Sequence, residues 1–367
     1  APDAARILKG LNPGSPKHCG AEVVGGRHLP DDWSGNIVTN DFRGNRVCRF
    51  VIQDDGAGFA SKELPELIKT KHVAFRPIDV KMGPDGAIYI ADWYNPIIQH
   101  GEVDFRDPRR DHTRGRIWRV TAKGRPLVDR PKLVGAATDE LLEALKAPED
   151  WTRHQAKRVI KERGKEVAPA LAAWVEGLDP ADPRVEHHRL EGLWTYQSLD
   201  LVEPDLLAKL LRASDPRVRA AATRVVAHWH PRLSDPLALL EVQVADDNPR
   251  VRLEAVRALA RSPEAFGRTG DAALDRPVDR FLDYALWLTA RAPAALARRG
   301  GGGRARLRRQ LAALVFALEA VGSKAVVKPL LASLRSGRLS RPRRRMHWHS
   351  SPLGANRTTW RPSMIGP

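Results

Sequence analysis

Residues 75–96 read FRPIDVKMGPDGAIYIADWYNP, and this stretch decides the first part of the fold. Two apolar runs, Ile78–Met82 and Ala87–Ala91, flank the turn Gly83-Pro84-Asp85-Gly86. Pro presets its own φ, Asp bonds its own backbone, and Gly takes positive φ at no steric cost. The segment RIWRV at Arg116–Val120 follows as a closing strand. We expect a β-hairpin whose buried face carries the alternating apolar residues Ile78, Val80, Met82, Ile88 and Ile90.

The preceding residues show the same turn-punctuated pattern. The apolar runs Asn36–Asn40 and Arg46–Ile52 predict a second hairpin with Gly44-Asn45 in its turn, and Asp54–Gly58 predicts a further turn. Glu63–Lys71 (ELPELIKTK) is interpreted as a loop or a short helix. Short strands at such intervals are typical of a sheet-repeat architecture, either a β-propeller or a β-sandwich.

The strand-rich part is too short for a closed propeller. About 120 residues supply one or two blades, and a propeller protects its strand edges by closing its ring. The chain also begins at Ala1 without an initiator Met. These observations predict that the chain is a fragment of a longer protein.

A repeat with a period of about 33 residues begins near residue 138. Asp182-Pro183-Arg184-Val185, Asp215-Pro216-Arg217-Val218 and Asn248-Pro249-Arg250-Val251 follow one another at this constant spacing, and Glu149–Thr152 is a degenerate copy. Such a period predicts stacked helix pairs in which Asp or Asn caps a helix and Pro occupies its first turn. The same register aligns basic, small and apolar positions: Arg153, Arg219 and Arg252; Ala156, Ala222 and Ala255; Arg158, Arg224 and Arg257; Ile160, Leu193, Val226 and Leu259.

Other helices are expected around these copies. Thr138-Asp139-Glu140 predicts a capped helix start, and Phe281–Ala290, Leu311–Val321 and Leu330–Leu334 predict helices after the repeats. Four tryptophans recur in this part and are interpreted as packing residues between helices: Trp151, Trp174, Trp194 and Trp229.

The net charge of +17 is concentrated at the end of the chain. Residues 291–367 hold 17 of the 61 Lys and Arg but one of the 44 Asp and Glu, so 44 basic and 43 acidic residues precede them. The folded part is therefore close to neutral, without a distributed footprint for nucleic acid. The basic tail lacks repeated RGG units and interleaved aromatics, so a disordered tail and a shifted reading frame stay open as explanations.

Cysteine usage and hydropathy limit the remaining classes. Cys19 and Cys48 form no CxxC motif, so no zinc or c-type haem motif is present and we expect no metal site. A disulfide between them and two small buried residues in strands stay open as alternatives. His18 beside Cys19 is interpreted as structural. No apolar run reaches the roughly 18 residues that predict a transmembrane helix.

The loop after the hairpin concentrates polar groups that could converge on a ligand. Strand-end loops of a propeller line one mouth of its channel, where His could act as a base and Arg could bind carboxylates or phosphates. The alternative is a loop held by its own ion pairs, Arg109 and Arg110 against Asp107 and Asp111. The candidate ligand-binding residues are Asp92, Asn95, His100, Arg109, Arg110, Asp111, His112 and Arg116.

Two parts of the sequence resemble known families. The repeats resemble HEAT-type α-solenoid repeats through Asp215…Val218-Arg219 and Asn248…Val251-Arg252, whereas Glu186 replaces the arginine in the Asp182 copy. The motifs of residues 75–96 and FRDPRRDHTRGRIWRV (residues 105–120) resemble the membrane-bound dehydrogenase family of planctomycetes and verrucomicrobia. In that family a glucose/sorbosone dehydrogenase-like propeller precedes HEAT-like repeats and a cytochrome c domain.

The resemblance implies an organisation and a function. We expect the last one or two propeller blades at residues 1–127, HEAT-like repeats at 138–336 and a basic low-complexity tail at 337–367. The parent would be an exported, periplasmic sugar or polyol dehydrogenase with pyrroloquinoline quinone and calcium. Its haem c would be on a cytochrome c domain that is absent here, since this sequence has no CxxCH motif. The alternative is a non-catalytic scaffold that binds a protein or polysaccharide, with a protein partner on the solenoid surface.

Overall fold

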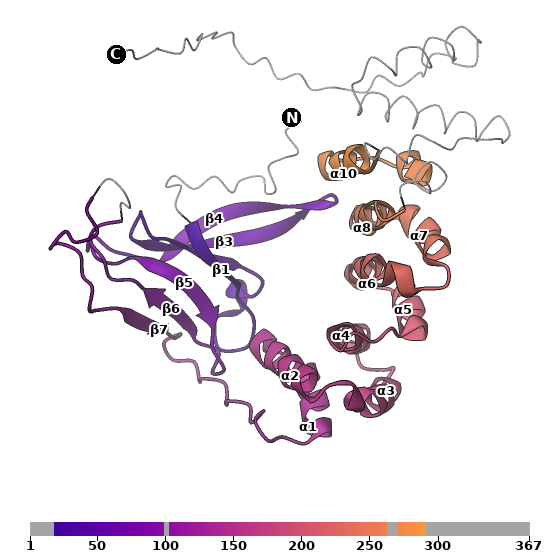
Figure 1. The fold of residues 1–367 in the computed structure, drawn as a ribbon, viewed down its shortest axis with the longest axis horizontal. Helices are drawn as coiled ribbons and strands as arrows, with labels where there is room; N and C mark the ends of the chain where they lie inside the picture. The colour runs from indigo at the N-terminus through magenta and orange to yellow at the C-terminus, as the bar shows by residue number, and fades with distance from the viewer. Residues whose placement is uncertain (1–17, 99–102, 263–269, 291–367) are drawn as a thin grey trace, which may run out of the picture. The chain divides into compact units, whose positions relative to one another are not determined.

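The computed structural model describes residues 18–98, 103–262 and 270–290. Within these residues the chain forms two antiparallel β-sheets followed by nine α-helices (Figure 1). The predicted helices at Leu311–Val321 and Leu330–Leu334 and the predicted tail lie outside the described residues.

The first sheet is a four-stranded antiparallel meander of order β1-β2-β3-β4. Its strands are β1 (His18–Val23), β2 (Ile37–Asp41), β3 (Arg46–Asp55) and β4 (Gly58–Lys69). The two predicted turns are confirmed: Asn45 has φ +54° and Gly56 has φ +60°, the left-handed conformation that Asn and Gly tolerate best. The sequence thus places the β2–β3 hairpin and the turn between β3 and β4 correctly.

The prediction of a loop or short helix at Glu63–Lys71 is wrong. Strand β4 continues to Lys69 along the edge of the sheet and pairs with β3. Pro65 is tolerated there because the pairing register shifts between Leu64 and Ile68, at a bulge where no ladder N–H is required. The single proline in this run therefore marks an irregular edge strand rather than a break.

The second sheet has three antiparallel strands in the order β5-β6-β7. They are β5 (Pro77–Met82), β6 (Ile88–Asp92) and β7 (Arg116–Val120), as the opening stretch predicts. The expected burial of Ile78 is wrong, since its side chain is 42% exposed. The register shifts between Pro77 and Asp79, and this bulge turns Ile78 outward while Val80 and Met82 stay buried.

One apolar core lies between the two sheets. Strand β5 packs against β1 and β2, and side chains from both sheets are buried together. Cys48 is buried in β3 and Cys19 is half-buried in β1, and both are free thiols. The disulfide alternative is therefore not formed in this structure. The buried apolar residues of this core are Val24, Leu29, Val38, Val47, Phe75, Val80, Met82, Ile88 and Ile90.

The helices form pairs that stack in chain order (Figure 1). We call the first and second member of each pair the first helix and the second helix. The first helices are α1 (Thr138–Glu143), α3 (Ala168–Glu176), α5 (Pro204–Leu210) and α7 (Pro236–Val244). The second helices are α2 (Asp150–Arg163), α4 (Val185–Ser198), α6 (Pro216–Trp229) and α8 (Pro249–Leu259), and α10 (Arg280–Ala290) continues their row.

The repeat register is confirmed by equal environments at equal positions. Ile160, Leu193, Val226 and Leu259 are all fully buried in the core of the stack. The side chains of Asp215 and Asn248 cap α6 and α8 by accepting from Arg217 N and Arg250 N, with Pro in the first turn of each helix. Trp229 is buried in this core, and three half-buried tryptophans pack against it: Trp151, Trp174 and Trp194.

Helix α1 begins at Thr138, as predicted, and its N-cap is Ala137. The Glu140 carboxylate accepts from Ala137 N at 2.7 Å, and the Thr138 hydroxyl instead accepts from Arg163 Nη1 at 2.9 Å. A side chain in the first turn thus satisfies a free backbone N–H at the start of this helix.

Arginines at one repeated position connect each repeat to the next. Arg153, Arg219 and Arg252 each donate Nη1 to the carbonyls five and six residues earlier. The rest of each guanidinium reaches the following repeat, where it meets Glu191, Asp246 or the Pro277 carbonyl. In the copy that departs from the HEAT pattern, Glu186 instead accepts from the backbone N–H groups of Ser214 and Asp215. We call these four residues the repeat anchors.

Candidate functional site

The predicted ligand-binding loop begins at Asp92, which is 3% exposed at the end of β6. Its Oδ1 accepts from Arg76 N and Tyr94 N at 2.8 and 2.9 Å, and its Oδ2 accepts from Trp118 Nε1 at 3.0 Å. These bonds support a turn in which Tyr94 has φ +53°, a conformation that L-residues rarely adopt. Both oxygens of the Asp92 carboxylate therefore already accept hydrogen bonds from residues in and beside the second sheet.

Asn95 is also bound from several sides. It is 2% exposed, its Oδ1 accepts from Ile97 N at 3.1 Å, and its Nδ2 donates to the Asp111 carbonyl at 3.3 Å. The buried Arg76 guanidinium donates Nε to the Asn95 carbonyl at 3.0 Å. Burial lowers the pKa of Arg76, and the Asp92 carboxylate opposes that shift. Arg76 is a positioning residue that the sequence analysis did not select.

The alternative that ion pairs hold this loop together is confirmed for Arg109. Arg109 donates Nε and Nη2 to the two carboxylate oxygens of Asp107 at 2.9 and 2.7 Å. This hydrogen bond lowers the pKa of Asp107 to about 2. Arg110 donates Nε to the Asp104 carbonyl at 3.0 Å and Nη2 to the Val103 carbonyl at 2.9 Å.

The last candidates follow the same pattern. The Asp111 carboxylate accepts from Thr113 N and Arg114 N at 3.0 Å, and these backbone bonds lower its pKa although burial opposes them. The Arg116 guanidinium lies over the Tyr94 ring, 3.4 Å from its centroid. His112 is exposed, and His100 lies outside the described residues. Among the candidates that the structure describes, the buried groups hold the loop together rather than converge on a common point.

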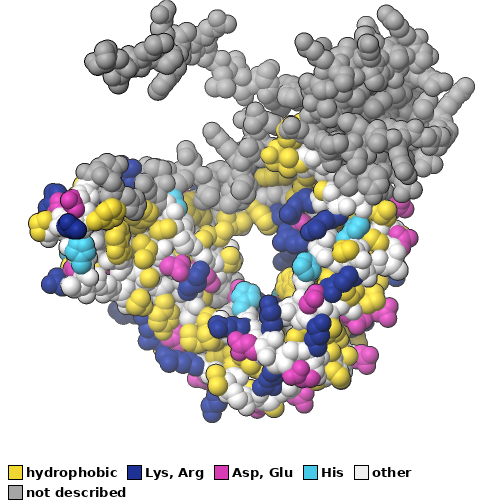
Figure 2. Space-filling view, in the orientation of Figure 1, with side chains coloured by type: hydrophobic (Ala, Val, Ile, Leu, Met, Phe, Trp, Pro, Cys, Tyr) yellow, Lys and Arg dark blue, Asp and Glu magenta, His cyan; other side chains and the backbone are white. Residues whose placement is uncertain are grey.

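A second candidate site is the charged face of the helix stack. The second helices together with α10 contain 13 Lys or Arg and six Asp or Glu, whereas the first helices contain one Lys and six Asp or Glu. Figure 2 shows Lys and Arg side chains gathered over α6 and α8. Because α6 packs against α4 and α8, these charges occupy adjoining positions along the stack. The positive charge is therefore concentrated on the second helices α2, α6 and α8, whereas α4 has one Arg and two Glu.

Three exposed arginines define this face, and we call them the arginine face. They are Arg217 and Arg224 on α6 and Arg257 on α8, with side chains 87%, 66% and 59% exposed. Arg217 and Arg224 are two helical turns apart and therefore share one side of α6. Arg224 and Arg257 are both salt-bridged to the buried Glu254, which fixes their stems while their outer surfaces stay exposed. The sequence register aligned Arg224 with Arg257 but did not reveal their exposure.

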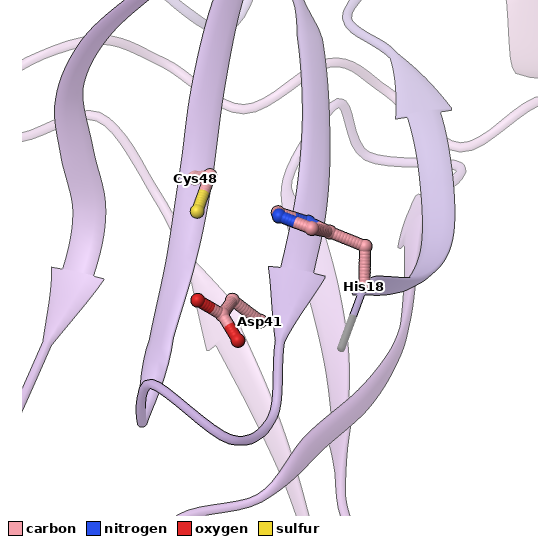
Figure 3. A group of neighbouring side chains, drawn as sticks. All are labelled: His18, Asp41 and Cys48. Atoms are coloured by element: carbon pink, nitrogen blue, oxygen red, sulfur yellow. The ribbon is translucent and has the colours of Figure 1, made fainter. Parts of the chain in front are cut away.

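A third group of side chains combines three types of metal ligand. His18 on β1, Asp41 on β2 and Cys48 on β3 offer ligand atoms within 4.8 Å of one another (Figure 3). Burial lowers the pKa of His18, and burial raises the pKa of the Cys48 thiol to about 12. The sequence analysis expected no metal site because these residues come from three strands and form no linear motif.

Comparisons with known proteins agree with the division into sheets and helices. Residues 203–297 match HEAT repeats, and this range includes the helices from α5 to α8 and α10. Residues 14–124, which include both sheets, match a domain of unknown function, DUF7133. No curated protein matches the chain. The fold is thus a mixed β and α structure in which two antiparallel sheets precede HEAT repeats.

None of the helices that the structure describes is both long and apolar enough to span a membrane.

Proposed function

We propose that this protein is a binding scaffold whose HEAT repeats hold an acidic segment of a partner protein. The observation that carries the proposal is the arginine face, which repeats exposed cations on neighbouring second helices. HEAT repeats commonly mediate protein interactions, and solenoids present extended surfaces for partners. A row of guanidinium groups is well suited to the carboxylates of Asp and Glu. Each of the three already pairs with Asp215 or Glu254, so a partner would bind through their exposed outer surfaces.

The loop at the end of β6 supports the scaffold over catalysis at this place. A catalytic or ligand-binding carboxylate needs a free lone pair that faces a substrate. The side-chain oxygens of Asp92 and Asn95 already accept hydrogen bonds from backbone N–H groups and, for Asp92, from Trp118 Nε1. A ligand at this loop would have to displace bonds that maintain the turn.

The test measures binding of a labelled 20-residue peptide of Glu, Asp and Gly to the full chain by fluorescence anisotropy. We expect Arg224→Gln combined with Arg257→Gln to weaken binding by about tenfold, which corresponds to about 0.7 kcal/mol for each exposed ion pair. The matched control is Lys209→Gln combined with Arg212→Gln, which removes the same charge from exposed positions at α5. Residues 291–367 are identical in both variants, so their charge contributes equally.

Two outcomes would reject the acidic-protein proposal. Equal weakening by both double variants would mean that the peptide responds only to net charge. Tighter binding of a 20-nucleotide single-stranded DNA than of the peptide, with the same dependence on Arg224 and Arg257, would assign the face to nucleic acid. A peptide in which Gln and Asn replace Glu and Asp should not bind.

We also propose that the two sheets are the last blades of a β-propeller. The order β1-β2-β3-β4 is the antiparallel meander that a propeller blade has, and the second sheet follows the same pattern with three strands. The family resemblance of residues 75–96 and 105–120 supports the same proposal. A structure of a longer protein that contains these residues would reject it if the sheets formed a sandwich instead.

The dehydrogenase function implied by the resemblance stays a proposal for the parent protein. It comprises an exported, periplasmic location, oxidation of a sugar or polyol, and electron transfer to an attached haem domain. Its support is the sequence resemblance of the strand-rich part. A full-length parent that reduces no dye with quinone and a panel of sugars would refute it.

A further inference from the structure

We propose that His18, Asp41 and Cys48 form a binding site for one zinc ion on the four-stranded sheet. The three donors are an imidazole nitrogen, a carboxylate oxygen and a thiol sulfur, all within 4.8 Å of one another. Zinc binds this combination of N, O and S ligands, whereas Mg²⁺ and Ca²⁺ require oxygen ligands throughout.

Strand register places the donors on one face of the sheet. His18 on β1 pairs directly with Asp41 on β2, and Asp41 pairs with Arg46 on β3. Cys48 follows Arg46 by two residues, so its side chain points to the same face as that of Arg46. Figure 3 shows the His18 ring directed toward the Asp41 and Cys48 side chains. Three hydrogen-bonded strands hold the ligands, which is a more rigid support than a loop.

Two unsatisfied nitrogens point independently to a missing ligand. Both Nδ1 and Nε2 of His18 are buried from solvent and have no hydrogen-bond partner among the described residues. A buried polar group without a partner costs about 1–3 kcal/mol, and a metal bond to one nitrogen would remove part of this cost. No described protein group supplies that bond.

The surrounding charges favour a cation. Asp41 accepts from Arg46 Nε at 3.1 Å, and Arg46 Nη1 also contacts Glu63 and Glu66 at 2.8 and 3.1 Å. Three carboxylates therefore surround one guanidinium, and Arg46 keeps two acidic partners when Asp41 turns to a metal. Lys69 also pairs with Glu66 at 2.9 Å, so the three carboxylates exceed the two cations by one negative charge. The Cys48 thiolate adds a second negative charge, and a dication would neutralise both.

Ion binding requires a small contraction and the loss of one proton. Ligand atoms of a tetrahedral zinc site lie about 3.3–3.8 Å apart, so the donors would approach one another by about 1 Å. Cys48 releases its thiol proton to solvent as sulfur binds the metal. Three protein ligands leave the fourth position for water, the arrangement found in open zinc sites.

The test uses Co²⁺ as a spectroscopic substitute for zinc, added to the reduced, metal-free full chain. We expect a near-ultraviolet charge-transfer band from a thiolate–cobalt bond and visible bands of tetrahedral cobalt, saturating at one ion per chain. The chain has two cysteines, so the band must come from Cys19 or Cys48. Cys48→Ser should abolish it, and Cys19→Ser, the matched control, should retain it.

Two further measurements keep the result interpretable. His18→Gln should weaken cobalt binding at least about 100-fold, since loss of a direct ligand exceeds the usual effect of losing a supporting residue. Zinc should raise the melting temperature of the wild type and of Cys19→Ser but not of Cys48→Ala, whose circular dichroism spectrum reports whether it has folded. A wild-type spectrum without a thiolate band, or a band that survives Cys48→Ser, would overturn the proposal.

Discussion

Arg219 donates Nε and Nη2 to the two carboxylate oxygens of Asp246, at 2.8 and 3.0 Å, across the boundary between two repeats. Both side chains are largely buried, 19% and 11% exposed. The same guanidinium donates Nη1 to the carbonyls of Ala213 and Ser214. One arginine thus closes the turn of its own repeat and holds the turn of the next.

We expect Arg219→Ala to lower the free energy of unfolding by about 2–3 kcal/mol, because it leaves a partly buried carboxylate and two carbonyls without their charged donor. Urea denaturation followed by circular dichroism measures this. The neighbouring Arg217→Ala is the control. It should change stability by less than about 1 kcal/mol, because the Arg217 side chain is 87% exposed in its ion pair with Asp215. Equal effects of the two variants would contradict the role of Arg219 as a repeat anchor.

A pH effect is expected at Glu186. Burial raises the pKa of its carboxyl, but the hydrogen bonds from Asp215 and Ser214 outweigh burial, so the pKa lies below its ordinary value. A depressed folded-state pKa stabilises the protein above the unfolded pKa of about 4.3, and this stability is lost as pH falls through the folded pKa. We expect Glu186→Gln to lower the stability at pH 7 by about 1–2 kcal/mol.

The measurement is urea denaturation of wild type and Glu186→Gln from pH 7 down to pH 3. The difference between their unfolding free energies should shrink below about pH 4.3, where the unfolded chain begins to bind the proton more readily than the folded chain. A difference that stays constant over this range would show that the charge of Glu186 does not hold the next repeat.

Asp92→Asn tests whether the β6 loop is structural. The variant retains one carbonyl oxygen for Arg76 N and Tyr94 N but turns an amide donor toward Trp118 Nε1, which is itself a donor. We expect a loss of about 1–3 kcal/mol in unfolding free energy, with a changed Trp fluorescence spectrum. His112→Ala, at an exposed position of the same loop, should remain within about 0.5 kcal/mol of wild type. An Asp92→Asn variant of unchanged stability would instead leave the carboxylate available for a ligand.

The raised pKa of Tyr196 predicts how the stability of the protein changes at alkaline pH. It is 5% exposed, and burial raises its pKa to about 12. The folded state keeps the phenol proton when the unfolded chain has released it, so stability decreases from the unfolded pKa of about 10 upward. Tyr196→Phe should remove this decrease, which approaches about 1.4 kcal/mol per pH unit for one group. Identical slopes of stability between pH 10 and 11.5 in both proteins would refute the shift.

The turns and the repeat register could be predicted because they depend on local sequence. Gly44-Asn45 and Gly83–Gly86 carry the residues that their turn conformations require, and Ile160, Leu193, Val226 and Leu259 recur because each repeat packs on the next. The irregular positions could not be found this way. Pro65 and Ile78 lie at strand bulges, and a bulge is set by pairing with another strand rather than by the local pattern.

The candidate sites differ in how much of them the sequence contains. The alignment of Arg224 with Arg257 was visible, but their exposure depends on how the helices stack. The cluster at His18 needed the pairing of β1 with β2, and residues 1–27 offered no periodic signal for that strand. Once the Gly44-Asn45 turn sets the register of β2 and β3, Asp41 and Cys48 are diagonal neighbours. Only the position of His18 was then missing.

The repeat anchors also affect how thermal unfolding proceeds along the helix stack. Each of Arg153, Glu186, Arg219 and Arg252 reaches the repeat that follows its own. In a repeat stack each repeat contacts only its neighbours. Loss of one interface therefore divides the stack into two groups of repeats that unfold separately. We therefore expect the stack to unfold one helix pair at a time, starting at a weakened boundary between repeats.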